Sequence, residues 1–347
     1  MAKDTPPPAA KPIAVPPPKP SRVLVIHTAF IGDIVLATPV LEALRTLLPA
    51  ADILFVTTPA GAKVLEPNPW GVRVRAFHKR GPERGARGLY RLGKELRAWN
   101  PELTFCLHRS FRSSLLSRLA GGDSWGFREA AGAFLFKHRV SRDGFEFEAD
   151  KNLALISAWS GVKGFSRFPR LRAASADNAA AASLLEGVGK FVAMAPSSVW
   201  ATKRWPAERF GRLAERLQRE HGLRTVVVGS DAPEDIAAAA ALMAASGAAR
   251  PLNLCGKTSL GALKSVLSRA ELVVSNDSSP LHMGIAAERP VVGIFGPTTR
   301  ELGFFPLVSC RPCGKHGHDR CPLGHFRCML DLTEESVYQE ISKLLCP

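Results

Sequence analysis

The chain lacks any hydrophobic run long enough to cross a lipid bilayer. No apolar stretch approaches the roughly 20 residues that a membrane helix needs, although 46% of the 347 residues are hydrophobic and 22% are charged. That balance is typical of a globular protein. Residues 1–20 are rich in proline and lack the apolar centre of a secretory signal peptide. We therefore expect a disordered tail at 1–20 and a cytoplasmic location.

Two kinds of sequence motif are also missing. No Gly-x-Gly-x-x-Gly follows the first strand-like segment, which disfavours a dinucleotide-dependent oxidoreductase. The spacings of helix-turn-helix, RRM and zinc-finger proteins are absent as well, which disfavours a nucleic-acid partner. A non-enzymatic polyanion binder is kept as a distant alternative.

Positive charge is in excess and is unevenly spread. The formal net charge is +15. Residues 71–142 hold 16 Lys and Arg against 5 Asp and Glu, so this stretch alone contributes +11. Such a stretch is either a solvated basic surface or a surface for a polyanion, such as nucleic acid, anionic lipid or a phosphorylated glycan. Charge alone does not choose between them.

Strand-like and helix-like segments alternate along most of the chain, which predicts parallel sheets covered by helices on both faces. A strand-like run at 22–30 precedes helical spacing over 32–49. The alternation breaks between about 130 and 188 and then restarts. We expect an α/β fold of two Rossmann-like, doubly wound domains that face each other across a cleft, where ligands of such sheets bind. The predicted units are 21–170, 185–332 and a final helix at 333–347.

Polar turns follow several predicted strands, and the first of them ends in an acid. FIGD (30–33) follows the first strand. Gly32 has the conformational freedom that a tight turn needs. Asp33 then begins a helix, where its carboxylate either caps free amides or serves as a general base.

Two further turns carry groups that suit phosphate. APSSVWATKRWP (195–206) lies between a strand and a helix and offers hydroxyls and cations near the helix start. NDSSPLH (276–282) ends a strand and begins a helix whose N–H groups and dipole favour an anion. The side chains in question are Ser197, Ser198, Lys203, Arg204, Asp277, Ser278, Ser279 and His282. The alternatives are a charged surface loop, a helix cap and an ordinary helix histidine.

Three segments together resemble the ADP-heptose:lipopolysaccharide heptosyltransferases, glycosyltransferase family 9. They are RVLVIHTAFIGDIVLATPVLEALR, APSSVWATKRWP and SNDSSPLHMGIAAERPVVGIFGPT, in the family's order and at about its spacing. The resemblance implies the GT-B fold, with the acceptor on the N-terminal domain and the nucleotide sugar on the C-terminal one. It also implies an inverting transfer without a catalytic metal. The implied donor is ADP-L-glycero-D-manno-heptose, and the implied acceptor is a phosphorylated, lipid-linked inner-core glycan.

The resemblance assigns roles by motif. Asp33 resembles the general base that deprotonates the acceptor hydroxyl, and Lys203 resembles the lysine that neutralises the leaving ADP. A D-[ST]-[GS]-x-x-H turn and nearby hydroxyls hold the donor's diphosphate and sugar. Their matches here are Ser197, Ser198, Asp277, Ser278, Ser279 and His282. Asp231 or Glu234 is the candidate contact to the nucleoside.

The chain departs from the family pattern at two turns. Ala29 and Phe30 stand where some relatives carry Ser or Thr, and Ser279 stands where glycine is usual.

The resemblance gives the basic stretch 71–142 a role, because the implied acceptor is acidic and lies at the inner face of the cytoplasmic membrane. Clustered Lys and Arg contribute about 1 kcal/mol each near an anionic surface. The first candidates are Arg109, Arg112 and Arg128.

Four of the seven cysteines lie within 310–328. They are Cys310, Cys313, Cys321 and Cys328, with His316, His318 and His325 between them. The short spacing lets two thiolates share one tetrahedral ion, and a reducing cytoplasm disfavours disulfides. A structural zinc or iron and a set of packed free thiols are the two alternatives. A similar Cys-rich tail looks typical of second-heptose members of the family, and autotransporter heptosyltransferases resemble this chain and bear an iron site.

We therefore expect a glycosyltransferase that adds heptose to the lipopolysaccharide inner core, most like the family's second-heptose enzymes. It would work without a catalytic cofactor, as a peripheral protein at the inner face of the cytoplasmic membrane. The alternative is a GT-B enzyme with another sugar nucleotide or with a protein acceptor.

Overall fold

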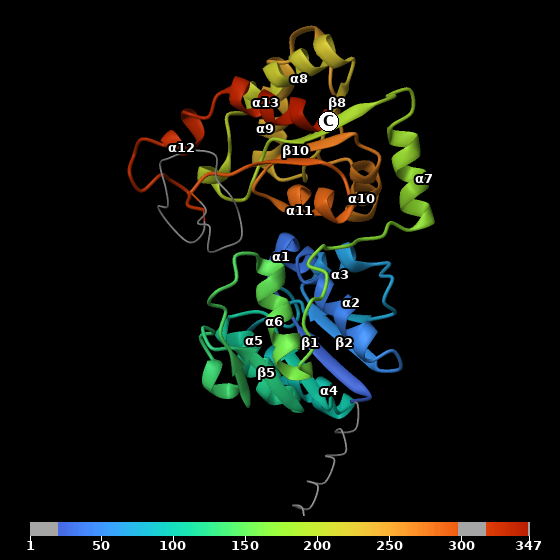
Figure 1. Cartoon of the computed structure of the whole chain (residues 1–347), viewed down its shortest axis with the longest axis vertical. Helices are drawn as coiled ribbons and strands as arrows, with labels where there is room; N and C mark the ends of the chain where they lie inside the picture. Colours follow the sequence, from blue (N-terminus) through green and yellow to red (C-terminus); the bar gives the residue numbers. More distant parts are fainter. Residues whose placement is uncertain (1–19, 298–316, 346–347) are drawn as a thin grey trace, which may run out of the picture.

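The computed structural model describes residues 20–297 and 317–345, which form two stacked α/β units (Figure 1). Each unit has a central sheet in which all neighbouring strands run parallel. The predicted α/β fold with two doubly wound halves is thereby confirmed. No helix within the described residues is long and apolar enough to span a membrane.

The N-terminal sheet has the strand order β3-β2-β1-β4-β5-β6, which reverses between β1 and β4. Its strands are β1 (Arg22–Ile26), β2 (Asp52–Thr57), β3 (Arg73–Ala76), β4 (Leu103–Cys106), β5 (Asp123–Phe127) and β6 (His138–Val140). The helices of this unit are α1 (Ile31–Val35), α2 (Thr38–Leu47), α3 (Pro59–Leu65), α4 (Gly85–Trp99), α5 (Phe111–Ala120), η1 (Ala133–Leu135) and α6 (Glu148–Ser160).

The second sheet has the equivalent order β11-β10-β7-β8-β9, which reverses between β7 and β10. Its strands are β7 (Phe191–Ala195), β8 (Arg224–Val227), β9 (Leu252–Asn253), β10 (Leu272–Asn276) and β11 (Val291–Ile294). Around them lie α7 (Ser175–Leu184), η2 (Ala201–Lys203), α8 (Ala207–His221), α9 (Pro233–Ala244), η3 (Gly247–Ala249), α10 (Leu260–Ser268), α11 (Ser279–Ala286), α12 (Arg327–Leu330) and α13 (Glu334–Leu345).

Burial on both faces explains the apolar runs of the central strands. In β1, Val25 has no exposed surface and lies between Phe55 of β2 and Phe105 of β4 in the sheet. In β10, Val274 is likewise buried beside Met194 of β7. A parallel strand covered by helices on both sides is apolar along most of its length. Polar groups that face a ligand therefore have to follow such strands.

The helical spacing over 32–49 belongs to two helices. α1 ends at Val35, and α2 begins at Thr38. Pro39 lacks the N–H that a continuous helix needs at this position. The Thr38 hydroxyl donates a hydrogen bond to the Val35 carbonyl at 2.8 Å instead. The break separates α1, which faces the second unit, from α2, which covers the first sheet (Figure 1).

The stretch 130–188, where the sequence pattern breaks, still holds regular elements. It contains η1, β6, α6 and α7. The strands β5, β6 and β9 were not predicted, because DSWGF, HRV and LN are short or interrupted by polar residues. The longest element of this stretch, α6, begins at Glu148 and ends at Ser160.

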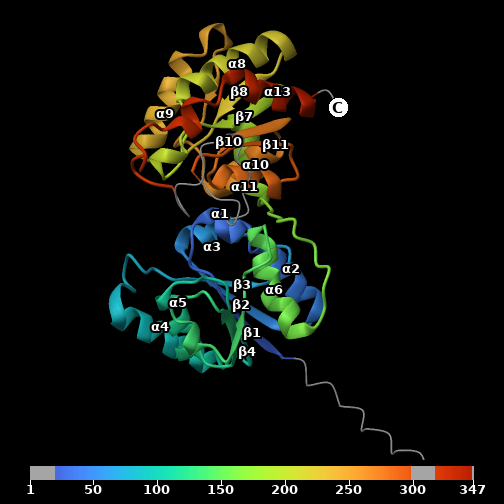
Figure 2. The same ribbon diagram turned by 60° about the vertical axis from the view of Figure 1, so that its left-hand side comes forward.

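The two units meet through helices at their facing ends (Figures 1 and 2). α1 packs against α11, and α3 packs against α10. Lys264 of α10 is 3% exposed, and its ammonium donates to the carbonyls of Val64 (3.2 Å) and Glu66 (2.6 Å) at the end of α3. The chain crosses between the units in 161–174, since α6 packs on α2 whereas α7 packs on α10.

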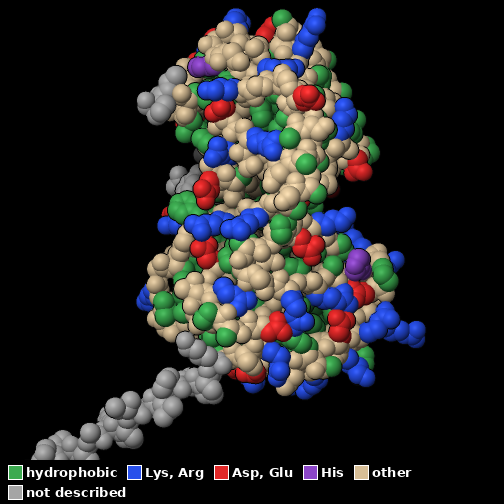
Figure 3. Space-filling model, turned by 90° about the vertical axis from the view of Figure 1, so that its right-hand side faces the viewer, with side chains coloured by type: hydrophobic (Ala, Val, Ile, Leu, Met, Phe, Trp, Pro, Cys, Tyr) green, Lys and Arg blue, Asp and Glu red, His purple; other side chains and the backbone are tan. Residues whose placement is uncertain are grey.

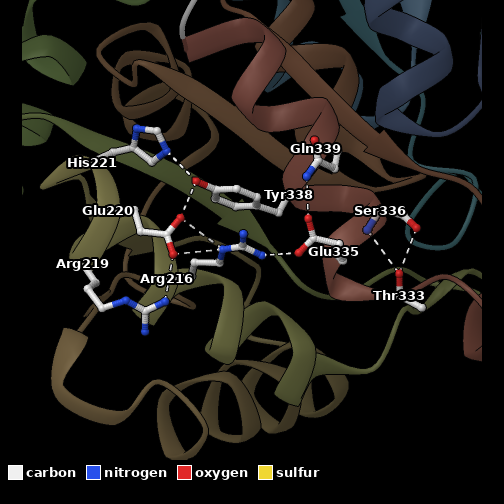
Figure 4. Close-up of polar contacts among 9 residues, drawn as sticks. All are labelled: Arg216, Arg219, Glu220, His221, Thr333, Glu335, Ser336, Tyr338 and Gln339. Atoms are coloured by element: carbon white, nitrogen blue, oxygen red, sulfur yellow. Dashed lines mark hydrogen bonds and ion pairs between the residues drawn. The ribbon is translucent and has the colours of Figure 1, made fainter.

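The final helix α13 docks on α8 of the second unit (Figure 4). The Tyr338 hydroxyl donates to Glu220 at 2.6 Å and lies 2.9 Å from Nε2 of His221. The Arg216 guanidinium lies 3.5 Å from the centre of the Tyr338 ring and pairs with both Glu220 and Glu335. These contacts place the last helix in the layer that covers the second sheet.

Positive charge is spread beyond the stretch 71–142. Figure 3 shows Lys and Arg side chains gathered along the constriction between the two units on one face. The crossing segment 161–174 contributes four exposed cations, which are Lys163, Arg167, Arg170 and Arg172. The junction of the two units is therefore basic as well.

Candidate active site

Polar residues follow the strands on both sides of each reversal in strand order. β1 and β4 lead to His27 and His108 in the first sheet, and β7 and β10 lead to Ser197 and Asp277 in the second. Open α/β sheets bind their ligands at these points. The three turns singled out in the sequence therefore lie at the ligand-binding edges of the two sheets.

Lys203 and Asp277 form a buried ion pair at the edge of the second sheet. Nζ of Lys203 lies 2.6 Å from Oδ2 of Asp277, and the side chains are 11% and 4% exposed. Ser198 donates its hydroxyl hydrogen to the backbone carbonyl of Asp277 at 3.1 Å. Arg204 donates in turn to the carbonyl of Ser198 at 2.7 Å. An ammonium has three N–H donors, so the bond to Asp277 leaves two of them for phosphate oxygens.

The start of α11 and the Ser197 hydroxyl lie beside this pair. Ser278 occupies the N-cap position, but its side chain makes no capping hydrogen bond, and its hydroxyl lies 3.1 Å from that of Ser275. The buried hydroxyl of Ser197 has no hydrogen-bond partner in the part of the chain that the structure describes. A buried hydroxyl left unsatisfied is costly. A phosphate oxygen is the kind of acceptor that would satisfy it.

Asp33 lies at the start of α1, on the first unit. Its carboxylate accepts a hydrogen bond from the Phe30 backbone N–H at 3.2 Å, so the capping prediction is confirmed. Burial raises the pKa of Asp33 to about 6, the charge of Glu148 raises this pKa as well, and the Phe30 amide lowers it. Lys203 and Asp277 of the other unit also act on the pKa of Asp33. The structure thus brings Asp33 within electrostatic reach of the Lys203–Asp277 pair.

α1 approaches α11 at a glycine. A Cβ atom on Gly32 would lie 2.7 Å from Cδ2 of His282. Gly32 lies inside α1 and has no positive φ, so the tight-turn interpretation is wrong, and the close approach of His282 is what requires glycine. Burial lowers the pKa of His282 to about 4; Asp277 opposes this shift and Lys203 adds to it. His282 is therefore a neutral imidazole at neutral pH.

Sequence reasoning missed a second carboxylate near Asp33. Glu148 begins α6 and pairs with Arg142 at 2.5 Å, with side chains only 14% and 8% exposed. The Arg142 guanidinium also lies 4.7 Å from the centre of the Phe127 ring. Arg142 follows the short strand β6. The sequence signal for this pair was therefore the cation Arg142 after the strand β6. It went unnoticed because the strand HRV has only three residues and cannot be recognised from its sequence.

Two histidines that the sequence analysis did not assign also lie at the edge of the first sheet. His27 and His108 have ring centres 5.9 Å apart. Both ring nitrogens of His27 are buried, and a hydrogen bond with the backbone of Asp33 acts on the pKa of this ring. Burial lowers the pKa of His108 to about 4, and burial also places the pKa of His27 well below its usual range. His27 directly follows β1, and His108 comes two residues after β4; a polar residue at the end of an apolar strand is the signal that could have found them.

The basic candidates divide between two places. Lys79 donates to the Thr28 carbonyl at 2.6 Å, and its pKa is lowered by burial and then by Arg80 and Arg112. Arg109 lowers the pKa of His108 and so lies on this same edge. Arg128 instead lines a groove of about 590 Å³ at the edge of the sheet. The other groove residues are Trp125, Lys137, His138, Arg139, Val140 and Ala158.

The nucleoside candidates are exposed, and the structure describes only part of the cysteine cluster. Asp231 and Glu234 are exposed after β8, whereas the neighbouring Asp235 accepts hydrogen bonds from the Ser230 amide and hydroxyl at 2.8 and 2.7 Å. Cys310 and Cys313 lie outside the described residues. Cys321 accepts a hydrogen bond from the Phe326 amide at 3.4 Å, and Cys328 is buried in the core of the second unit. No group of three or more potential ligands among the described residues could hold a metal ion.

The facing doubly wound sheets have the GT-B fold, and the protein is a glycosyltransferase. The chain belongs to glycosyltransferase family 9 (heptosyltransferase), which matches residues 89–319. It is 24% identical over 357 residues to lipopolysaccharide heptosyltransferase 2 of Salmonella typhimurium, covering 93% of this chain and 98% of that protein. It is 29% identical over 176 residues to lipooligosaccharide heptosyltransferase 2 of Campylobacter jejuni, where the match spans 47% of this chain and about half (54%) of that protein.

The fold also resembles a solved heptosyltransferase structure. The structure of Escherichia coli ADP-heptose lipopolysaccharide heptosyltransferase II superimposes with a TM-score of 0.74 at 22% identity. The match covers 93% of this chain and 98% of that one. At this identity the likeness establishes the fold.

Proposed function

We propose that the protein transfers heptose from ADP-heptose to the core of a lipopolysaccharide. The observation that carries the proposal is the buried pair Lys203–Asp277, within electrostatic reach of Asp33 of the facing unit. A cation beside a helix start suits a diphosphate, and a carboxylate of raised pKa suits proton removal. The names of the Salmonella relative and of the E. coli structure support heptose as the sugar and lipopolysaccharide as the acceptor class.

The proton step falls to Asp33. Its carboxylate takes the proton of the acceptor hydroxyl while that oxygen forms a bond to the anomeric carbon of the heptose. A base is most effective when its pKa lies near the working pH, and burial brings the pKa of Asp33 to about 6. The Phe30 amide fixes the carboxylate in place at 3.2 Å.

The leaving-group step falls to the second unit. As the bond between the anomeric carbon and the diphosphate oxygen breaks, the electron pair goes to ADP, and negative charge grows on the β-phosphate. Lys203, held by Asp277 at 2.6 Å, and the amides at the start of α11 stabilise that charge from fixed positions. Ser197, Ser278 and Ser279 supply hydroxyls to the diphosphate, and Ser198 holds the Asp277 turn through its hydrogen bond to the Asp277 carbonyl. His282 faces the sugar as a neutral imidazole.

The acceptor belongs on the N-terminal unit, together with the membrane surface. Lys79, Arg109 and Arg112 lie near the two histidines that follow β1 and β4, where they suit the phosphate groups of an acidic glycan. Arg128 lies on the neighbouring groove and suits further anionic groups. Peripheral binding at the inner face of the cytoplasmic membrane is part of this proposal, since the acceptor is lipid-linked.

Thermal shift with nucleotide sugars tests the donor. A ligand that binds the folded state raises the melting temperature, so ADP-heptose should raise it while UDP- and GDP-sugars should not. Lys203→Met should remove most of the shift, and Lys190→Met, exposed ahead of β7, should keep it. A larger shift with a UDP- or GDP-sugar would overturn the ADP-heptose assignment. Release of ADP in the presence of a heptosylated acceptor then tests the transfer itself.

A structural zinc or iron within 310–328 is a separate prediction. It assigns no step of the reaction to a metal. Elemental analysis of the purified chain decides it, with Cys310→Ser and Cys313→Ser as variants that should lower the metal content. A metal-free chain that is folded and active would contradict it.

A further inference from the structure

Two aromatic side chains of the N-terminal unit lie side by side in solvent. Phe111 at the start of α5 is 50% exposed, and Phe134 in η1 is 71% exposed. Their ring centres are 6.5 Å apart. Phenylalanine is usually buried, and an exposed apolar pair rimmed by polar residues often marks an interaction surface.

The loop that carries Phe134 is held firmly to the body of the unit. The Ala131 amide donates to the Arg109 carbonyl at 3.0 Å, which ties the loop to the turn before α5. Phe136, just after η1, is 4% exposed and anchors the other end. A Cβ atom on Gly132 would lie 3.2 Å from Cδ2 of Phe111, so the loop packs directly on that ring. The exposure of Phe134 is therefore imposed by a packed loop.

Cations dominate the chain around this pair. Residues 109–139 contain six Lys and Arg against two acids, Asp123 and Glu129. Arg112 is exposed directly beside Phe111. The remaining five cations are Arg109, Arg118, Arg128, Lys137 and Arg139. Aromatic groups among cations are the combination that binds the interface of an anionic bilayer, because the rings enter the headgroup region while the cations meet the lipid phosphates.

We propose that Phe111 and Phe134 form a membrane-docking surface, with the rings inserted into an anionic lipid bilayer and nearby cations, above all the exposed Arg112, on its phosphates. Phe111 begins α5, after the turn that follows β4 in the sheet whose β1 leads to Asp33, and the Phe134 ring lies 6.5 Å from that of Phe111. They therefore lie on the sheet edge that carries the proposed base. A lipid-linked acceptor held at this surface would extend its sugars along that edge. This proposal rests on the proposed function for its purpose, but the binding itself needs neither donor nor acceptor.

Sedimentation of the full chain with lipid vesicles tests the proposal. The vesicles contain phosphatidylglycerol with phosphatidylcholine, or phosphatidylcholine alone. The test variants are Phe134→Ser and Phe111→Ser. Phe168→Ser is the matched control, because Phe168 is 68% exposed and the two cations nearest to it along the chain pair with acids, Arg167 with Asp150 at 3.0 Å and Arg170 with Glu42 at 3.4 Å.

The expected result is binding to the anionic vesicles that weakens as salt is raised. Each test variant should lose on the order of tenfold in vesicle affinity, the effect of removing one buried aromatic ring, and Phe168→Ser should lose nothing. Equal binding by Phe134→Ser and the parent chain would overturn the proposal. So would equal loss in the control, or no binding to vesicles at all.

Turnover separates this proposal from the proposed function. Phe134→Ser should keep its rate on a water-soluble, delipidated acceptor and lose rate on the same acceptor embedded in vesicles. Vesicle binding without any heptose transfer would refute the function and leave the docking surface. A change of oligomeric state in Phe134→Ser by analytical ultracentrifugation, with unchanged vesicle binding, would assign the pair to a protein contact instead and overturn the proposal.

Discussion

At the scale of single residues, the proposed role of Asp33 as general base predicts that the reaction depends on pH. A general base acts as its carboxylate, and burial raises the pKa of Asp33 to about 6. We expect kcat/KM to rise with pH up to about 6 and to level off above it. Asp33→Asn should lower the rate at pH 7.5 on the order of 100-fold or more, and Asp143→Asn, on an exposed turn, should not. Near-normal turnover of Asp33→Asn would refute the assignment.

The same pKa has a consequence for stability. A carboxyl group whose pKa is higher in the folded state than in the unfolded chain favours folding when protonated, so its ionised form costs stability as pH rises through about 6. Asp33→Asn removes that cost. The inactive variant should therefore melt no lower than the parent chain at pH 7.5, which distinguishes loss of the base from loss of the fold.

A second prediction concerns Glu148, whose charge raises the pKa of Asp33. Glu148→Gln removes a negative charge and leaves the cation of Arg142, now without its carboxylate partner, in the same place. Both changes favour the ionised form of Asp33. The acid limb of the kcat/KM profile should shift to lower pH, whereas Glu186→Gln, an exposed glutamate after α7, should not move it. A profile that keeps its midpoint would show that Glu148 does not act on the base.

At the scale of elements, the contact between α1 and α11 predicts an intolerant glycine. A Cβ on Gly32 would lie 2.7 Å from the His282 ring, so Gly32→Ala should push the two helices apart and misplace Asp33. We expect a loss of kcat/KM on the order of 100-fold with little change in melting temperature. Gly81→Ala is the matched control, since its nearest contacts would be at 3.7 Å. Normal turnover of Gly32→Ala would show that the interface relaxes at no cost.

Elements also show what the sequence could and could not reveal. β1 and β10 were predictable because burial on both faces leaves them apolar, and the turns after them stood out as polar breaks. Glu148 and Arg142 were not predictable, because their neighbourhood follows a three-residue edge strand with no periodic signal. The two-helix break at Pro39 was readable from proline chemistry. The contact of Gly32 with His282 joins residues 250 positions apart, and no local pattern encodes it.

At the scale of the whole molecule, the proposed mechanism requires Asp33 of the first unit and Lys203 of the second to face each other. Lys264 links the units, because its buried ammonium donates to the last carbonyls of α3 at 3.2 and 2.6 Å. The negative end of that helix's dipole favours a cation there. Lys264 belongs to neither set of reacting groups, so its loss tests the arrangement of the units separately from the chemistry.

Lys264→Met keeps the shape of the side chain but leaves the carbonyls of Val64 and Glu66 without their donor. This costs about 1–3 kcal/mol in the arrangement in which α3 and α10 are in contact. Because each sheet and its helices stay intact, the lost free energy lowers the fraction of molecules in which the two units are placed for the reaction. We expect kcat/KM to fall roughly tenfold and the radius of gyration from small-angle X-ray scattering to increase. Lys257→Met on the exposed surface should change neither. An unchanged radius together with a lower melting temperature would mean that Lys264 stabilises the second unit and does not hold the two units together.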